Sequence, residues 1–271
     1  MSIWRLLNTG ALPGTLNMAI DQALLHLHTL DLSPPTLRFY QWQPPAVSIG
    51  YFQQPEAMNL SPCPSLGIDL IRRPTGGRAV LHQNDLTYSL IAGTKEGIPS
   101  SLPKAYHLIC EGLLAGFRWL GIEAKMGQET PAGRPPEICF LRSSIGDIVC
   151  QGKKFVGNAQ MWSGSSLLQH GSIILEPQNE TWTDLMVLNP VSKEGFYAEL
   201  KSRTTSLLEL LGYKIETGQI IAAIEKGMAQ ILDLTFETGQ LSPEEWALAR
   251  KIAQDDRKKE EIPGKTHHNF G

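Results

Sequence analysis

The segment from Arg72 to Asp85 constrains this chain more than any other stretch of its sequence. Two arginines precede a Pro-Thr-Gly-Gly turn, and a short apolar run leads from the turn to His82. The apolar residues on each side of the turn predict a strand before it and a strand after it. Paired glycines allow φ > 0 and let the backbone approach a ligand closely. Arginines beside them can hold a phosphate or a carboxylate. The segment indicates either a ligand-binding turn between two strands or an ordinary hairpin loop with solvated arginines.

Helical patterns occur in the first half of the chain. Apolar residues recur at helical spacing over 16–30, and we expect Thr15 or Asn17 to cap this helix. The same spacing recurs over 102–120, where Gly121 is expected to end the helix.

Strand patterns and a helical C-terminal third complete the chain. We expect a single α/β domain over 1–255, with a small helical part from about 193 and a frayed tail over 256–271. Predicted strands cover 3–7, 36–40, 46–51, 67–72, 86–92, 147–150, 154–162 and 167–175, and predicted C-terminal helices cover 193–211, 216–232 and 242–254.

Composition excludes several classes of protein. The formal net charge of −3 over 271 residues gives no electrostatic basis for binding nucleic acid. The sequence lacks an apolar run long enough to span a membrane and a secretory signal, so we expect a cytoplasmic protein. The cysteines form no C-x-x-C pair and have no histidine cluster beside them, so we expect free thiols and no metal site. They are Cys63, Cys110, Cys139 and Cys150.

Cys139 is the candidate nucleophile, because it follows a loop rich in Gly, Pro and Glu. A thiol reacts as its thiolate, and a free pKa of about 8.5 leaves only a few per cent ionised at pH 7. A nearby partly buried lysine would favour the thiolate, and Lys154 can supply that charge. Cys150 competes for the role, but its apolar neighbours indicate a packed strand residue. The alternative interpretation of Cys139 is a small buried hydrophobic residue.

Lys154 lies in a segment with strand alternation, in which every second residue faces the same side. We expect Lys154 to share a polar face with Val156, Asn158 and Gln160, while Gly157 and Ala159 leave room on the other face. A lysine aligned with amide side chains indicates the wall of a polar pocket. The alternatives are an exposed strand lysine, and ordinary strand-end histidines at His82 and His170.

Several of these segments closely resemble the motifs of the biotin/lipoate protein ligase (BPL/LPL) catalytic-domain family. The resemblance extends from about residue 3 to residue 250, and its motifs occur in the family's order. They are the stretches 72–82 with 86–89, 152–160, 168–175, 17–24 and 38–44.

The resemblance implies a mixed, largely antiparallel sheet flanked by helices, and the transfer of a medium-chain acyl group to a lysine of a small carrier domain. Two chemistries share this fold. Lipoate-protein ligases use ATP and magnesium to make an acyl-adenylate. Octanoyltransferases take octanoate from acyl carrier protein through a cysteine thioester, and they need no cofactor.

The resemblance favours the octanoyltransferase branch. Cys139-Phe140 matches the Cys-Phe pair of that branch, and Cys139 precedes Lys154 by the fifteen residues that the branch shows. Arg78 stands where ligases usually have a small residue, and it would crowd a nucleotide phosphate. Two departures stand out: Asn158 replaces the usual serine, and Asp85 comes two residues later than the aspartate that often follows the histidine. Which carboxylate, if any, orients His82 is left open.

The resemblance assigns roles to particular residues and partners. Cys139 and Lys154 would be catalytic. The donor would be octanoyl–acyl carrier protein, and the acceptor a lipoyl-carrier protein such as the glycine-cleavage H protein or a dehydrogenase E2 domain. The alternatives are an ATP-dependent lipoate-protein ligase and an inactive acyl- or biotin-binding regulator or carrier-docking protein. The acyl chain would lie near the glycine turn, and the expected substrate-binding residues are Arg73, Gly76, Gly77, His82, Gly157, Asn158, Ala159 and His170.

Overall fold

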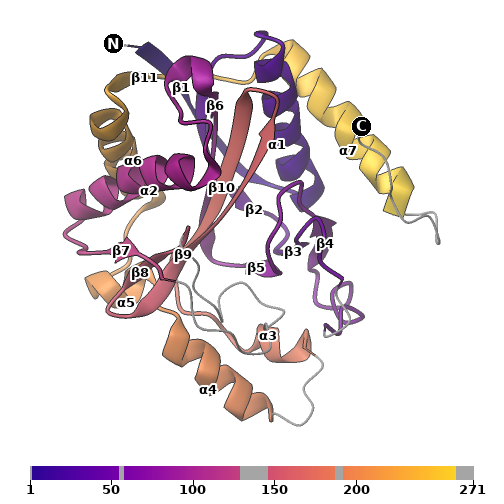
Figure 1. Cartoon of the computed structure of the whole chain (residues 1–271). Helices are drawn as coiled ribbons and strands as arrows, with labels where there is room; N and C mark the ends of the chain where they lie inside the picture. The colour runs from indigo at the N-terminus through magenta and orange to yellow at the C-terminus, as the bar shows by residue number, and fades with distance from the viewer. Residues whose placement is uncertain (1, 55–57, 129–145, 187–191, 261–271) are drawn as a thin grey trace.

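A computed structural model describes residues 2–54, 58–128, 146–186 and 192–260, with side chains up to residue 256. Cys139 and Phe140 lie outside these residues. A large sheet with helices on both faces is joined by a smaller three-stranded sheet (Figure 1). The large sheet has the order β11 (Leu234–Thr238), β1 (Ser2–Leu12), β2 (Thr36–Trp42), β6 (Asp85–Gly93), β10 (Ser166–Ile174), β9 (Lys153–Ser163), β8 (Ile148–Cys150) and β7 (Lys125–Met126).

The large sheet is mostly antiparallel, because only β1 pairs in parallel, with β2 on one side and β11 on the other. Strands β6 and β10 are buried along their whole length, as expected for a sheet with both faces covered. The prediction of a mixed, largely antiparallel sheet flanked by helices is confirmed.

Helices α2 (Leu102–Trp119) and α6 (Thr217–Leu232) cover one face of the sheet, and α1 (Gly14–Thr29) and α7 (Pro243–Glu260) cover the other (Figure 1). The contact between α2 and α6 is close: a Cβ added at Gly227 would lie 2.1 Å from the backbone nitrogen of Gly116. The remaining helices are η1 (Thr94–Glu96), α3 (Thr181–Asp184), α4 (Lys193–Arg203) and α5 (Leu207–Leu211).

The predicted ends of the first two helices had different outcomes. Helix α2 ends at Trp119, and Gly121 follows with φ of +76° as predicted. Helix α1 begins at Gly14, with Pro13 as N-cap and no side-chain cap, so the predicted cap is wrong. Asn17 lies inside the helix, where it is buried and donates to the carbonyl oxygens of Leu12 and Gln41.

The small sheet corrects the simplest interpretation of the glycine turn. Strands β4 (Asp69–Arg72) and β5 (Val80–His82) flank the turn, as the sequence predicts. However, both strands pair with β3 (Ala46–Ile49), which lies between them. The turn therefore does not close a hairpin, and it crosses the end of β3 instead.

The C-terminal part is helical as predicted, with three differences. The predicted helix over 193–211 is interrupted at Thr204, which forms an isolated bridge with Lys154 of β9. Strand β11 was not predicted. Helix α7 continues to residue 260, so residues 256–260 do not belong to a frayed tail, and 261–271 lie outside the described residues.

Strand β9 carries one extra residue opposite β8. Lys154 pairs with Val149. Val156 pairs with Ile148, so Phe155 is the extra residue. Phe155 and Val156 both pack in the main core, which is the geometry of a β-bulge. The bulge interrupts the alternation, so the prediction that Lys154 shares a face with every second later residue of β9 is wrong.

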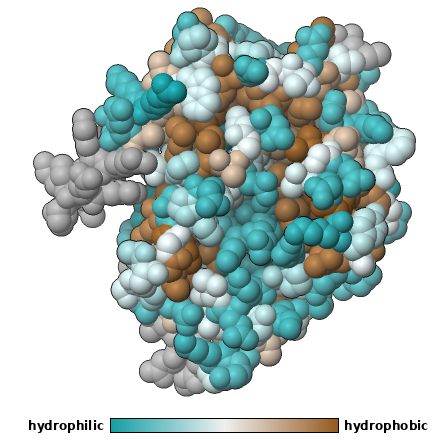
Figure 2. All heavy atoms as spheres, turned by 180° about the vertical axis from the view of Figure 1, so that it is seen from behind, coloured by the Kyte–Doolittle hydropathy of each residue, from teal (hydrophilic) through white to brown (hydrophobic). Residues whose placement is uncertain are grey.

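The face of the molecule drawn in Figure 2 is not uniformly apolar. Figure 2 shows hydrophobic side chains mixed with hydrophilic ones, which predominate toward the lower end of that view. The most exposed large hydrophobic residues, Phe52 and Leu32, come from different loops. Within the described ranges, every helix is too short or too polar to cross a lipid bilayer.

Candidate active site

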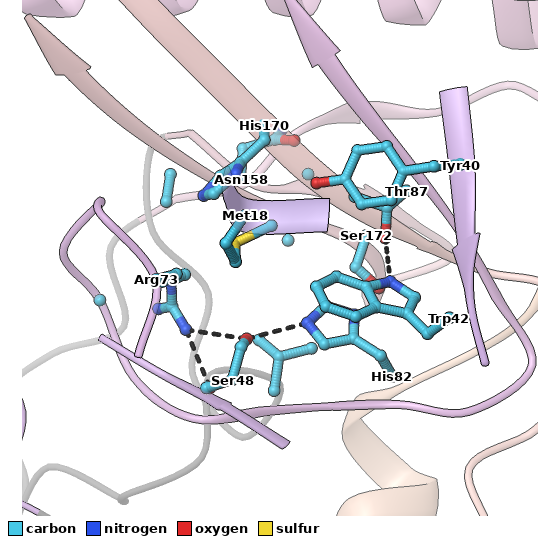
Figure 3. Close-up of a pocket in the computed structure, with 15 residues that line it drawn as sticks. Met18, Tyr40, Trp42, Ser48, Arg73, His82, Thr87, Asn158, His170 and Ser172 are labelled. Atoms are coloured by element: carbon cyan, nitrogen blue, oxygen red, sulfur yellow. Dashed lines mark hydrogen bonds between the residues drawn. The ribbon is translucent and has the colours of Figure 1, made fainter. Parts of the chain in front are cut away.

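A cavity of about 420 Å³, including its opening, lies between the two sheets (Figure 3). Its wall combines α1, β2, β6, β9, β10 and the small sheet with its glycine turn. All predicted substrate-binding residues except Gly76 line this cavity, although they come from three distant stretches of sequence. They are Arg73, Gly77, His82, Gly157, Asn158, Ala159 and His170.

Arg73 holds the glycine turn in place. Its guanidinium donates to the carbonyl oxygens of Gly76 and Arg78, each at 2.8 Å, and of Ser48 at 3.0 Å. Arg72 donates in the same way to Gly50 O at 2.7 Å. Carbonyl oxygens in an irregular loop need donors, and these arginines supply them. Arg73 therefore supports the glycine turn and also faces the cavity, whereas Arg72 supports the loop that follows β3.

His82 is fixed on three sides. Its Nδ1 lies 2.9 Å from Oδ2 of Asp85, and its Nε2 lies 2.8 Å from Oγ of Ser48. The ring stacks on Trp42 with centroids 3.9 Å apart, and Trp42 donates to Thr87 at 2.8 Å (Figure 3). The carboxylate that orients His82 is therefore that of Asp85, three residues further along the chain.

His170 lies in the middle of β10 and not at a strand end as predicted. Its Nε2 is 2.6 Å from Oγ1 of Thr75, and its Nδ1 is 3.3 Å from Oδ2 of Asp21. Burial lowers the pKa of His170, and this effect exceeds the opposing attraction of Asp21. The neutral ring therefore links the glycine turn to helix α1.

Asp21 is the centre of a fully buried polar network. Burial raises the pKa of Asp21, but the charge of Arg38 and the hydrogen bonds from His170 and Ser89 outweigh it, so the pKa is lowered. Nη1 of Arg38 lies 2.7 Å from Oδ1 of Asp21, and both side chains are fully buried. Tyr40 donates to the second carboxylate oxygen at 2.9 Å. The charged carboxylate thus anchors one wall of the cavity.

Lys154 is buried, so the alternative of an exposed strand lysine is wrong. Its Nζ lies 2.9 Å from Oδ2 of Asp147, and each side chain is 2% exposed. The Lys154 carbonyl also accepts from the backbone nitrogen of Thr205 at 3.0 Å, which ties this end of β9 to the C-terminal part. Gly157, Asn158 and Ala159 line the cavity three to five residues further along the same strand.

The three described cysteines are free but are poor nucleophiles. Burial, and to a lesser extent the charge of Asp147, raises the pKa of Cys110 to about 12. Burial also raises the pKa of Cys63 and of Cys150. Cys150 is buried in β8, so the prediction that it is a packed strand residue is confirmed. Within the described ranges, no group of three or more His, Cys, Asp or Glu side chains is arranged to hold a metal ion.

The sequence-based list lacked the site's carboxylates and its aromatic wall. A charged residue inside an apolar segment was the available signal for Asp21 and Arg38, which occupy core-facing positions of α1 and β2. Asp85 was noted only as an uncertain partner of His82. Asp147 gave no signal, because a single aspartate before a strand is common.

The fold is that of lipoate-protein ligases. A putative lipoate protein ligase from T. acidophilum, solved with bound lipoic acid, superposes with a TM-score of 0.76 at 23% identity, covering 94% of this chain and 96% of that one. A lipoate-protein ligase A bound with ATP gives a TM-score of 0.76 at 24% identity, with 94% and 95% coverage.

Sequence comparison identifies the family. Residues 13–229 match the model of the lipoyl protein ligase A/B catalytic domain, and the chain belongs to this family. It is 36% identical over 262 residues to octanoyltransferase LipM of Geobacillus kaustophilus, covering 93% of this chain and 94% of that protein. It is 38% identical over 259 residues to octanoyltransferase LipM of Symbiobacterium thermophilum, with 93% and 94% coverage. The predicted octanoyltransferase branch is confirmed, and the protein is an acyltransferase.

Proposed function

We propose that this acyltransferase moves octanoate from octanoyl–acyl carrier protein to a lysine of a lipoyl-carrier protein, with Cys139 as the thioester-forming nucleophile. The main supporting observation is that the buried ammonium of Lys154 lies on the strand whose next residues line the cavity. The raised pKa values of the described cysteines add support, because they leave Cys139 as the remaining thiol.

In the first half-reaction, the Cys139 thiolate attacks the carbonyl carbon of the donor thioester. Charge develops on the carbonyl oxygen, where the fixed ammonium of Lys154 stabilises it. The bond from carbon to the pantetheine sulfur then breaks, and this sulfur leaves and takes up a proton. The enzyme now carries octanoate as a thioester of Cys139, and the free acyl carrier protein departs.

In the second half-reaction, the neutral amine of the carrier lysine attacks the enzyme thioester. The bond from carbon to Cys139 sulfur breaks and an amide forms, while Lys154 or a water relays the proton that the amine loses. Because a thioester is converted to an amide, the sequence is downhill and needs no ATP or metal. Two steps through one nucleophile predict ping-pong kinetics.

The setting of the reaction is part of the proposal. Acceptors of the expected kind are the glycine-cleavage H protein and a dehydrogenase E2 domain. We place the reaction in the cytoplasm, where a nucleophilic thiol stays reduced. The octanoyl chain would lie in the cavity beside Gly77, where Gly157 and Ala159 present no bulky side chain.

The test is intact-mass measurement after mixing the enzyme with octanoyl–acyl carrier protein. The wild type should gain one octanoyl group, and adding apo H protein should transfer it. The adduct should be absent in Cys139→Ser and present in the matched variant Cys150→Ser. A parallel reaction with free octanoate, ATP and magnesium should give no octanoylated carrier. An unmodified Cys139 together with full ATP-dependent activity would overturn the proposal in favour of a ligase.

A further inference from the structure

An amide side chain connects the middle of the large sheet to the segment that approaches Lys154. Asn158 Oδ1 accepts from the hydroxyl of Tyr88 on β6 at 2.8 Å, and Asn158 Nδ2 donates to the carbonyl oxygen of Gly146 at 2.6 Å. The backbone nitrogen of Asn158 also donates to Oδ1 of Asp147 at 3.4 Å. One residue therefore contacts both Gly146 and Asp147.

The Gly146 end of this connection is tightly fixed. The sulfur of Cys110 on α2 donates to the same carbonyl oxygen at 3.5 Å. A Cβ added at Gly146 would lie 2.7 Å from a ring carbon of Tyr106. The segment thus packs flat against α2 and has little freedom to shift while the Asn158 bond holds. Asp147 follows directly in the chain.

The opposite end of the connection is also fixed. Gln169 donates to the Tyr88 hydroxyl at 2.8 Å and accepts from Gln160 at 2.9 Å. Burial raises the pKa of Tyr88 well above its ordinary value, so its hydroxyl keeps the proton that it donates to Asn158. The chain of hydrogen bonds runs across β9, β10 and β6, and every described step has a defined donor and acceptor.

Space for the Asn158 amide is provided by a glycine. Gly171 is opposite Asn158 on the paired strand β10, and a Cβ there would lie 1.9 Å from Oδ1 of Asn158. A serine at position 158 has one hydroxyl in place of a carbonyl and an NH₂ group, so it cannot accept from Tyr88 and donate to Gly146 at the same separation. The Asn158 side chain therefore fits the space beside Gly171 and the hydrogen-bonding groups of Tyr88 and Gly146.

We infer that Asn158 is a positioning residue, which holds the Gly146–Asp147 segment so that the Asp147 carboxylate keeps the Lys154 ammonium in its catalytic place. This inference rests on the proposed function, in which Lys154 stabilises the developing oxyanion. Asp147 acts directly on Lys154 through the 2.9 Å contact, and Asn158 acts through Asp147. Misplacement of a catalytic group by about 1 Å can cost roughly 100-fold in rate.

The test measures the rate of octanoyl-adduct formation from octanoyl–acyl carrier protein in rapid-quench single turnovers. Asn158→Asp keeps the shape of the side chain but removes the NH₂ donor to Gly146. We expect the maximal acylation rate to fall by about 10- to 100-fold, with little change in the donor concentration that gives half-maximal rate. Asn158→Ser should show a smaller loss of the same kind. Asn8→Asp, an exposed asparagine on β1, is the matched control and should acylate at the wild-type rate.

A double-mutant cycle separates positioning from general damage. If Asn158 acts through Asp147, then Asn158→Asp should lower the maximal acylation rate much less in an Asp147→Asn background than in the wild type. Thermal melting of every variant identifies those that fail to fold, and Asn158→Ser provides a second, milder variant at the same position.

The outcomes are distinct. If the wild type forms no adduct, the proposed function is wrong, and the positioning role is wrong with it. If the wild type forms the adduct, variants with unchanged rates, additive effects in the cycle, or a change confined to the half-saturating donor concentration would overturn the positioning role alone. The last result would make Asn158 only a wall of the acyl cavity.

Discussion

Oδ2 of Asp85 lies 2.9 Å from Nδ1 of His82, and both side chains are buried. The same carboxylate oxygen accepts from the hydroxyl groups of Thr87 at 3.0 Å and Ser172 at 2.6 Å. One oxygen atom therefore ties the small sheet, through β5, to β6 and β10 of the large sheet. The cavity lies between these sheets, so this contact sets the distance between its walls.

Asp85→Asn should destabilise the protein, because the neutral amide oxygen is a weaker acceptor than the carboxylate oxygen that His82, Thr87 and Ser172 now share. We expect a loss of about 1.5–3 kcal/mol in the free energy of unfolding, measured by urea denaturation. Ser172→Ala removes a single donor and should cost only about 1 kcal/mol. A loss for Asp85→Asn no greater than that for Ser172→Ala would show that the shared carboxylate is not the anchor.

Periodicity was enough to predict most of the helices and strands, whereas the architecture of the sheet was predicted from the family resemblance. The apolar spacing over 102–120 predicted α2 and its stop at Gly121, because the helix ends where a residue with φ > 0 follows. Pairing could not be predicted in the same way. Nothing local in 46–51 indicates that β3 lies between β4 and β5, because strand order depends on contacts between segments far apart in sequence.

The same limit applies to the site. The glycine turn, His82 and His170 were predicted because short motifs carry them. Asp21 and Asp147 were missed because each is recognised only by its partner, and Asp21 is 149 positions from His170. The bulge at Phe155 could not be predicted from the alternation that it breaks. The role of Cys139 stays a prediction, because that residue lies outside the described part of the chain.

Gly171→Ala should destabilise the protein and slow acylation. The added Cβ would lie 1.9 Å from Oδ1 of Asn158 and 2.6 Å from a ring carbon of Tyr88. Neither neighbour can move without breaking the hydrogen bond that joins them, so we expect a cost of about 1–3 kcal/mol from overpacking. Urea denaturation and single-turnover acylation would measure the two effects.

Gly218→Ala is the matched control for this substitution. A Cβ at Gly218, in the first turn of α6, meets no atom within 4 Å. Alanine favours a helix over glycine by up to about 1 kcal/mol, so this variant should be as stable as the wild type or more so. Equal stability of the two alanine variants would contradict the proposed crowding at Gly171.

His170 should make the stability of the protein depend on pH below about 6.5. Burial lowers its pKa below the ordinary value of 6.5, so the folded state binds fewer protons here than the unfolded state. Stability should therefore rise with pH through this window. The contribution of His170 should be fully present above about pH 6.5 and be lost as the pH falls toward the folded-state pKa. Chemical denaturation at pH 5.5 and pH 7.5 measures the difference.

The His170→Gln variant isolates this contribution. Glutamine cannot titrate, so the loss of stability between pH 7.5 and pH 5.5 should be smaller than in the wild type. Burial also lowers the pKa of His28, so His28→Gln should reduce the same slope independently. An unchanged slope in His170→Gln would mean that the ring titrates equally in the folded and unfolded states.

Lys154→Met should separate stability from catalysis. The substitution removes the ammonium that Asp147 contacts at 2.9 Å in a buried site, and breaking one side of a buried ion pair typically costs about 3–5 kcal/mol. Adding Asp147→Asn removes the buried negative charge and should restore part of that stability. Neither variant can stabilise the developing oxyanion, so both should fail to form the octanoyl adduct.

The two measurements check different parts of this prediction. Urea denaturation should rank the wild type first, the double variant second and Lys154→Met last, while intact mass should show the adduct in the wild type alone. The pairing of Asp31 with Lys95 is a control, because both side chains are more than half exposed. Lys95→Met should change the free energy of unfolding by no more than about 1 kcal/mol. It should leave adduct formation unchanged. Adduct formation by Lys154→Met at the wild-type rate would remove Lys154 from the reaction, because a thioether carries no charge to place on the carbonyl oxygen.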